Sequence, residues 1–122
     1  MTVSPVIDAM RNLYLHPQSF EVSIQDRIAE SLTERGIEFQ REYRLGPRNR
    51  VDFLCPHGIA IEVKKGKPGS SALTAQAERY AAFDAVSSII LVVERSVFDP
   101  PVEANGKPVY YIALSRNWGV AL

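Results

Sequence analysis

Two short segments of the chain, residues 50–55 and 59–64, alternate between apolar and polar side chains with the two-residue period of a β-strand. Three residues, 56–58, separate them, so the pattern predicts a β-hairpin with a tight loop. In the register that this loop sets, the apolar positions of both strands share one face: Val51, Phe53, Cys55, Ile59, Ile61 and Val63. This face is expected to pack on the core of the domain.

The other face of the predicted hairpin brings like charges together. Asp52 is expected opposite Glu62, and Arg50 opposite Lys64. Like charges directly opposite on neighbouring strands destabilise a sheet. A divalent cation held between Asp52 and Glu62 removes the repulsion and uses both carboxylates as ligands. The alternative is a solvated sheet face with ordinary salt bridges, such as one from Arg50 to Glu62.

The rest of the chain predicts three helices and three further strands. The helices are expected at residues 6–15, 20–35 and 72–85, and the strands at residues 38–45, 88–93 and 109–114. Gly36 is expected to stop the second helix, and Ser70 and Ser71 are expected to cap the third. The resulting order, α-α-β-β-β-α-β-β, predicts a single α/β domain over residues 1–122, with helices packed on a mixed sheet.

The charge of the chain becomes informative when its distribution is considered. The formal net charge is zero, but residues 41–67 carry seven of the fourteen basic side chains against three acidic ones. The local field matters more than the total for a polyanionic ligand. This segment is therefore expected to bind phosphates, the alternative being a solvated strand edge that discourages aggregation.

Two further features concern location. The longest apolar run, residues 89–93, is far too short to span a bilayer. The N-terminus lacks a basic stretch followed by an apolar one, which is the pattern of a secretory leader. A cytoplasmic protein without membrane contact is expected.

The helix over residues 20–35 places polar side chains at the start of its apolar face. At helical spacing, four positions fall within about 60° of one another: Glu21, Gln25, Ile28 and Leu32. A carboxylate on the buried side of a helix is costly unless it is paired or coordinates a cation. Glu21 is therefore a candidate third metal contact, and equally a first-turn acid that complements the helix dipole.

Asp52, Glu62 and Lys64 together suit metal-assisted phosphodiester hydrolysis. Hard oxygen ligands favour Mg²⁺ or Mn²⁺. Such an ion polarises a phosphoryl oxygen and lowers the pKa of a bound water. Lys64 shares the strand face of Glu62, so it can orient that water or neutralise charge that builds up on the phosphorus.

Four sequence elements, taken in order, resemble the PD-(D/E)XK nuclease superfamily. They are Glu21 with Gln25, Arg50-Val51-Asp52, Ile61-Glu62-Val63-Lys64, and Gln76 with Tyr80. The resemblance covers about residues 20–94 and implies an α-β-β-β-α-β core. It also implies that Asp52, Glu62 and the backbone carbonyl of Val63 bind Mg²⁺. Lys64 would assist catalysis, and an acid of the first core helix would complete the site.

The resemblance leaves one position open and contains one substitution. The helix acid falls on Glu21 in one alignment and on Gln25 in another, and glutamine is the poorer ligand. Val51 stands where the family has proline, a change that leaves the strand intact. Gln76 and Tyr80 share one helix face and are expected to support the site or to contact nucleic acid. Their residue types alone also suit a core tyrosine with a hydrogen-bonded glutamine.

The function implied by the resemblance is a Mg²⁺-dependent deoxyribonuclease, of a kind carried by phages and mobile elements. It would act as a homodimer where both strands of a duplex are cut. The expected nucleic-acid contacts are Arg44, Arg48, Arg50, Lys65, Lys67, Gln76 and Tyr80. The alternatives are a non-catalytic nucleic-acid-binding module that keeps the fold, and a nuclease that acts on RNA. The intact set of Asp52, Glu62 and Lys64 favours catalysis, because binding alone gains nothing from opposed like charges.

Overall fold

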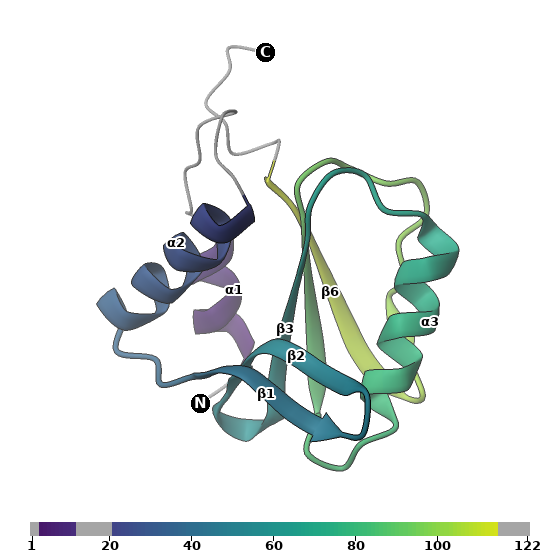
Figure 1. Cartoon of the computed structure of the whole chain (residues 1–122), viewed down its shortest axis with the longest axis horizontal. Coiled ribbons are helices and arrows are strands. Elements are labelled where there is room, and N and C mark those ends of the chain that lie inside the picture. Colours follow the sequence, from purple (N-terminus) through teal and green to yellow (C-terminus); the bar gives the residue numbers. More distant parts are fainter. Residues whose placement is uncertain (1–2, 12–20, 115–122) are drawn as a thin grey trace.

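The computed structural model describes residues 3–11 and 21–114, which form a mixed α/β fold of three helices and a six-stranded sheet (Figure 1). Its elements are α1 (Val3–Arg11), α2 (Glu21–Glu34), β1 (Gln40–Gly46), β2 (Asn49–Cys55), a 3₁₀ turn (Pro56–Gly58), β3 (Ile59–Lys64), α3 (Ser70–Ala81), β4 (Ser88–Val93), β5 (Glu103–Ala104) and β6 (Lys107–Ala113). The strands lie in the order β1-β2-β3-β4-β6-β5. The predicted mixed α/β class is confirmed, and the short strand β5 is an addition to the predicted order.

The direction of the strands changes across the sheet. β1, β2 and β3 are antiparallel neighbours, whereas β3, β4 and β6 run parallel to one another. β5 closes the far edge antiparallel to β6. The hairpin predicted from residues 50–64 therefore forms the join between an antiparallel half and a parallel half of one sheet.

The helices cover both faces of this sheet, as Figure 1 shows. α1 and α2 pack on one face, in a buried cluster that includes Ile28, Phe53 and Ile61. α3 packs on the other face, in a cluster that includes Leu73 and Leu91. Every residue of β4 is buried, because the centre of a parallel sheet is covered on both sides, and this explains its continuous apolar sequence.

The strand β1 carries a local kink at Glu42, which lies opposite Asp52 of β2. Odd-numbered side chains lie on opposite faces of the sheet on the two sides of this kink. Phe39 and Phe53 pack under α1 and α2, whereas Tyr43 and Val51 pack under α3. Glu42 has a φ of +52°, a left-handed conformation that is rare in a strand, so the pleat turns over locally. The expected unbroken apolar face is therefore wrong at Val51.

The third helix differs from its prediction at both ends. It spans Ser70–Ala81 rather than residues 72–85. Its N-cap is Gly69, which provides no side-chain cap, so the expected serine cap is wrong. Ser70 Oγ instead donates a hydrogen bond to the backbone carbonyl of Asp99, at 2.7 Å. A tertiary contact thus takes the hydroxyl that a local capping rule would assign to the helix.

The first two helices follow their predictions more closely. α2 ends at Glu34, two residues before Gly36, which has a φ of +69°, and the N–H of Ile37 donates to the carbonyl of Leu32 at 2.9 Å. This is the hydrogen-bond pattern of a glycine C-terminal stop. The predicted helix over residues 6–15 is confirmed as far as Arg11, and residues 12–15 lie outside the described residues. None of the described helices is long and apolar enough to cross a membrane.

Candidate functional site

The strands β2 and β3 separate where Asp52 and Glu62 come together. Their backbone ladder consists of Phe53 with Ile61, Leu54 with Ala60 and Cys55 with Ile59, and it ends there. Beyond it, the N–H of Asp52 donates to Glu62 Oε1 at 3.2 Å. The N–H of Val63 donates to Asp52 Oδ2 at 2.7 Å. The two carboxylates therefore replace the backbone acceptors of a regular ladder.

This arrangement confirms part of the predicted register and corrects the rest. The three ladder pairs are the predicted ones. The expected continuation, with Asp52 and Arg50 paired directly opposite Glu62 and Lys64, is wrong because the ladder has already ended. The carboxylates of Asp52 and Glu62 are nonetheless close neighbours, since each accepts a hydrogen bond from the backbone of the other strand.

Glu62 is buried under α3, with 7% of its surface exposed. Burial raises the pKa of Glu62 from its ordinary value of 4.5 to about 7, and the charge of Asp52 raises it as well. Lys64 acts in the opposite direction, by its charge and by a hydrogen bond. Perturbed carboxyl groups of this kind concentrate at functional sites. The carboxyl group of Glu62 thus titrates near neutral pH.

Lys64 lies at the end of β3 and turns toward the buried carboxylate. Its Nζ is 3.5 Å from Glu62 Oε2, and its side chain is 32% exposed. Arg50, which was expected to oppose Lys64, instead pairs with Glu42 at 3.5 Å on the exposed surface. The expected repulsion between two cations is thus replaced by two separate ion pairs, one of which belongs to the site.

Gln76 and Tyr80 of α3 connect the two strands of the site. Gln76 Nε2 donates to Glu62 Oε2 at 3.2 Å and to Tyr80 Oη at 2.9 Å. The hydroxyl of Tyr80 donates to the backbone carbonyl of Arg50 at 3.1 Å. Burial, and then the charge of Glu62, raises the pKa of Tyr80 well above its usual range, so the phenol keeps its proton. These contacts fit support of the site and equally fit the alternative of a core tyrosine with a hydrogen-bonded glutamine, and contact with nucleic acid stays a prediction.

The remaining amide atom of Gln76 borders a pocket. Oε1 is buried and has no hydrogen-bond partner among the described residues, which is a costly state for an acceptor. The adjoining pocket, of about 280 Å³, is lined by Lys64, Pro68, Ala72, Leu73, Ala75, Gln76 and Arg79. Arg79 was not singled out in the sequence, although its spacing of three from Gln76 places both on one side of α3.

The described part of α2 contacts β1 rather than the carboxylates. Arg41 Nη1 is 3.1 Å from Asp26 Oδ1, and its Nη2 donates to Gln25 Oε1 at 3.4 Å. The same guanidinium lies 5.4 Å from the ring centroid of Phe53. The side chain of Gln25 is thus directed to Arg41, and the choice between Glu21 and Gln25 for the helix acid stays open. The side chain of Glu21 lies outside the described part of the structure, so its metal contact stays a prediction.

The basic side chains expected to bind phosphates lie in two parts of the chain, the tip of the β1–β2 hairpin and the segment that follows β3. A pocket of about 280 Å³ at the tip of the β1–β2 hairpin is lined by Arg44, Gly46, Arg48, Asn49 and Arg50. Arg44 lies opposite Arg50 in the ladder, so a bound anion would relieve the repulsion between them. Lys65 and Lys67 are exposed in the segment that follows β3.

The donor set can be tested against the metal that the resemblance implies. The described residues contain no group of three or more His, Cys, Asp or Glu side chains placed to hold a metal ion. They do bring together the two carboxylates of Asp52 and Glu62. Mg²⁺ keeps several waters and is commonly bound through one or two carboxylates together with substrate phosphates. The residues present therefore fit Mg²⁺ better than they fit a metal that requires a closed protein cage.

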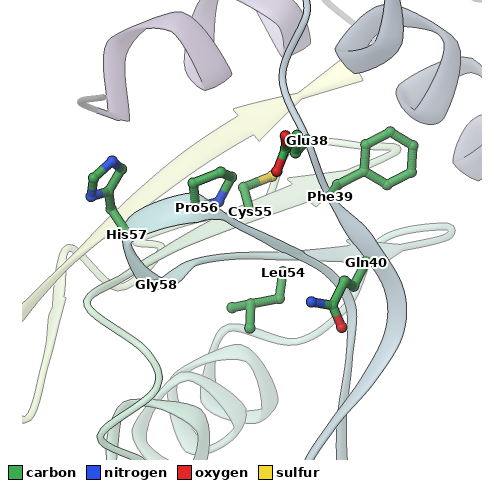
Figure 2. A pocket seen from close by; sticks show the side chains of 8 residues that line it. All are labelled: Glu38, Phe39, Gln40, Leu54, Cys55, Pro56, His57 and Gly58. Atoms are coloured by element: carbon green, nitrogen blue, oxygen red, sulfur yellow. The ribbon is translucent and has the colours of Figure 1, made fainter.

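A further pocket, of about 380 Å³, lies at the other end of β2 (Figure 2). Its lining residues are Glu38, Phe39, Gln40, Leu54, Cys55, Pro56, His57 and Gly58. Burial raises the pKa of the Cys55 thiol to about 11, so the sulfur stays protonated and is a poor nucleophile at neutral pH. The pocket contains none of the expected site residues, and we assign no chemistry to it.

Comparisons with protein-family models, with curated proteins and with solved structures found no match to this chain. The class of this protein is therefore described from its own fold and site. It is a mixed α/β domain in which the buried carboxylate of Glu62, the half-buried carboxylate of Asp52 and a lysine lie where two antiparallel strands separate.

Proposed function

We propose that this chain is a Mg²⁺-dependent deoxyribonuclease of the PD-(D/E)XK type, which hydrolyses phosphodiester bonds in DNA. The observation that carries the proposal is the neighbouring pair of Asp52 and Glu62, with Lys64 Nζ 3.5 Å from the latter. Placing two carboxylates together in a partly buried site opposes folding. A metal-dependent reaction at this position explains why the chain keeps both.

The order of the elements supports the same class. From α2 to β4 the chain runs α-β-β-β-α-β, which is the order that the resemblance implies. The carboxylates come from the second and third strands of this series, and Gln76 and Tyr80 come from the helix that follows. Motif residues from three consecutive elements thus meet at one place.

Asp52 and Glu62, with the backbone carbonyl of Val63, are the groups that would hold Mg²⁺, and Glu21 is the further acid of the proposal. The ion supplies polarisation of the phosphoryl oxygen and acidification of a water. Because the pKa of Glu62 is about 7, a proton competes with the cation for this carboxylate. Metal binding should therefore strengthen as the pH rises through 7.

Lys64 is placed to act on the reacting phosphate. Its ammonium group reaches the buried carboxylate, while a third of its side chain remains open to solvent. A cation at this boundary stabilises negative charge as it accumulates on the phosphoryl oxygens, more strongly in the transition state than in the ground state. Arg79, which lines the same pocket as Lys64, offers a second cation to the substrate backbone.

The DNA backbone is proposed to follow the cations on either side of the carboxylates. Arg50 precedes Asp52 by two residues and lines the basic pocket of the hairpin tip. Lys65 directly follows Lys64 and is exposed. Both groups of cations therefore border the site, where each phosphate contact adds salt-dependent affinity. Cleavage of both strands of a duplex needs two such sites, so the proposal includes a homodimer.

The proposal is tested by incubating the purified protein with linear, branched and single-stranded DNA and with RNA, in Mg²⁺ or in EDTA. We expect cleavage of at least one DNA in Mg²⁺, its loss in Asp52→Asn, and its retention in Glu34→Gln, a matched change of an exposed acid at the end of α2. Binding without cleavage by the unmodified chain would contradict the proposal and identify a binding module. Preferential cleavage of RNA would contradict the assignment of DNA as the substrate.

A further inference from the structure

The loop between β4 and β5, residues 94–102, carries the large hydrophobic side chains that are most exposed in the described structure. Phe98 is 90% exposed and Val102 is 78% exposed. A hydrophobic side chain exposed singly on a surface needs no explanation. Phe98 is a different case, because its backbone is held in place and because the loop lies beside the candidate site.

Hydrogen bonds hold the loop on both sides of Phe98. The N–H of Val97 donates to the hydroxyl of Tyr111 at 2.7 Å. The carbonyl of Asp99 accepts a hydrogen bond from Ser70 Oγ, also at 2.7 Å. Two prolines follow Asp99 and restrict the chain further. The aromatic ring is thus presented on an ordered backbone, which lowers the entropy lost when a ligand binds to it.

The same loop runs alongside the segment that leaves the candidate site. The N–H of Glu94 donates to the carbonyl of Lys64, and the N–H of Arg95 to the carbonyl of Gly66, both at 3.0 Å. The N–H of Gly66 returns a hydrogen bond to Glu94 Oε1 at 2.7 Å. Figure 1 shows both segments emerging from the same end of the sheet. The loop that carries Phe98 therefore begins at the edge of the sheet that carries Lys64.

Exposed cations occur in both of these neighbouring segments. They are Lys65 and Lys67 after β3, and Arg95 in the loop itself. The acids of the same segments are Glu94, which is bonded to the neighbouring backbone, and Asp99. An exposed ring beside a cationic track is the arrangement that binds single-stranded nucleic acid, because the ring stacks on a base while the cations hold the phosphates.

We propose that Phe98 stacks on an unpaired nucleobase next to the bond that is cut. The preferred substrate is then a nucleic acid with a single-stranded segment at the site, such as a single strand, a flap or a frayed end. A base inside a continuous duplex has both faces covered by its neighbours and offers no surface to the ring. The cleavage preference rests on the proposed nuclease function, whereas the stacking contact is a binding property that can be measured without cleavage.

The binding test uses fluorescence anisotropy in EDTA with two probes, a labelled oligo(dT) of about 20 nucleotides and a blunt duplex of similar length. Phe98→Ala is expected to weaken oligo(dT) binding roughly 5- to 150-fold, the range of a base-stacking contact, and duplex binding less than about twofold. Phe98→Trp should restore the affinity, because tryptophan also stacks. Val102→Ala, the matched change of the other exposed side chain, should leave both affinities unchanged.

The other possible outcomes separate the stacking contact, the substrate preference and the nuclease function. Equal losses for both probes, or no loss for either, would overturn the stacking role of Phe98. A shift in oligomeric state of Phe98→Ala during sedimentation would also overturn it, by showing that the loop contacts a second copy. In Mg²⁺, cleavage of blunt duplex and single strand at equal rates by both the wild type and Phe98→Ala would overturn the substrate preference while the nuclease stands. Selective oligo(dT) binding without any cleavage would support the contact and reject the nuclease.

Discussion

Glu62 Oε1 accepts a hydrogen bond from the backbone N–H of Asp52 at 3.2 Å, and Asp52 Oδ2 accepts one from the backbone N–H of Val63 at 2.7 Å. Each acid thus holds the strand of the other at the point where the β2–β3 ladder ends. Because the two carboxylates substitute for backbone acceptors, they stabilise the fold and also form the candidate site. Substitutions here have to be interpreted with stability and activity measured separately.

The first prediction concerns the pH dependence of stability. The folded-state pKa of Glu62 is about 7, above the value of about 4.3 in an unfolded chain. The folded protein therefore binds this proton more tightly, and its free energy of unfolding should fall as the pH rises through this interval. Glu62→Gln removes the dependence, so relative to the wild type the variant should gain on the order of 2–3 kcal/mol between pH 5 and pH 8.

Urea unfolding at intervals between pH 5 and pH 8, in EDTA, measures this difference directly. Glu34→Gln serves as the control, because Glu34 is exposed at the end of α2 and its substitution should leave the pH profile parallel to that of the wild type. Parallel profiles for Glu62→Gln and the wild type would show that the buried carboxyl does not titrate in this range.

The second prediction is that Mg²⁺ or Mn²⁺ stabilises the folded protein through Asp52 and Glu62. At pH 8 and a metal concentration ten times the dissociation constant, mass action adds about 1.4 kcal/mol. For a domain of this size the melting temperature should rise by roughly 4–6 °C. Asp52→Asn should lose this shift. Equal shifts in both proteins, or none in either, would count against the site.

The third prediction concerns the hydrogen bonds that run from Glu62 through Gln76 and Tyr80 to Arg50. Tyr80→Phe removes the hydroxyl, so the carbonyl of Arg50 loses this donor and Gln76 Nε2 keeps only its hydrogen bond to Glu62. The free energy of unfolding should fall by about 1–3 kcal/mol. Tyr110→Phe, the same change at a half-buried tyrosine of β6, should cost less than about 0.5 kcal/mol. Equal losses in the free energy of unfolding of the two variants would mean that these hydrogen bonds contribute nothing to stability.

The fourth prediction tests the basic pocket at the hairpin tip, which Arg44 and Arg48 line. Replacing both by alanine should weaken DNA binding for all sequences and reduce the slope of log affinity against log salt by about 2. Arg35→Ala, an exposed arginine after α2, is the control and should keep the slope. An unchanged slope in the double variant would place the phosphate track elsewhere.

The elements set by local sequence were predictable. The strand Ser88–Val93 was predicted to the residue, because a strand buried on both faces is a continuous apolar run with polar ends. The helix Glu21–Glu34 was predicted to within one residue at each end, because Gly36 provides a local stop signal. The three hairpin pairs followed from the loop length and the alternation alone.

The features that depend on tertiary contacts were not predictable in the same way. The kink at Glu42 requires a positive φ at a residue whose type gives no signal for it. It changes the face of Val51, which strict alternation placed with Phe53. The hydrogen bonds from the backbone of each strand to the carboxylate of the other form only because the β2–β3 ladder ends before these residues. The sequence pattern therefore identified the candidate residues of the site but not the contacts among them.

The last prediction is that Lys64→Ala abolishes hydrolysis while the fold and most of the DNA affinity persist. Lys64 makes an ion pair with Glu62 that involves one partly exposed cation, so its loss should change stability modestly. Its proposed contact with the phosphoryl oxygens strengthens as charge develops, so its loss should lower turnover by roughly two to four orders of magnitude. Cleavage rates under single-turnover conditions, with affinities measured in EDTA, separate the two effects.

Lys65→Ala is the matched control, since Lys65 is the next residue and is exposed. It should weaken binding slightly through one lost phosphate contact and leave the single-turnover rate at saturation close to that of the wild type. Because Lys64 lowers the pKa of Glu62, its removal should also move the pH dependence of stability further toward alkaline pH. Wild-type cleavage by Lys64→Ala would reject the proposed mechanism. A shifted stability profile with lost cleavage would confirm that one lysine serves both the buried carboxylate and the reaction.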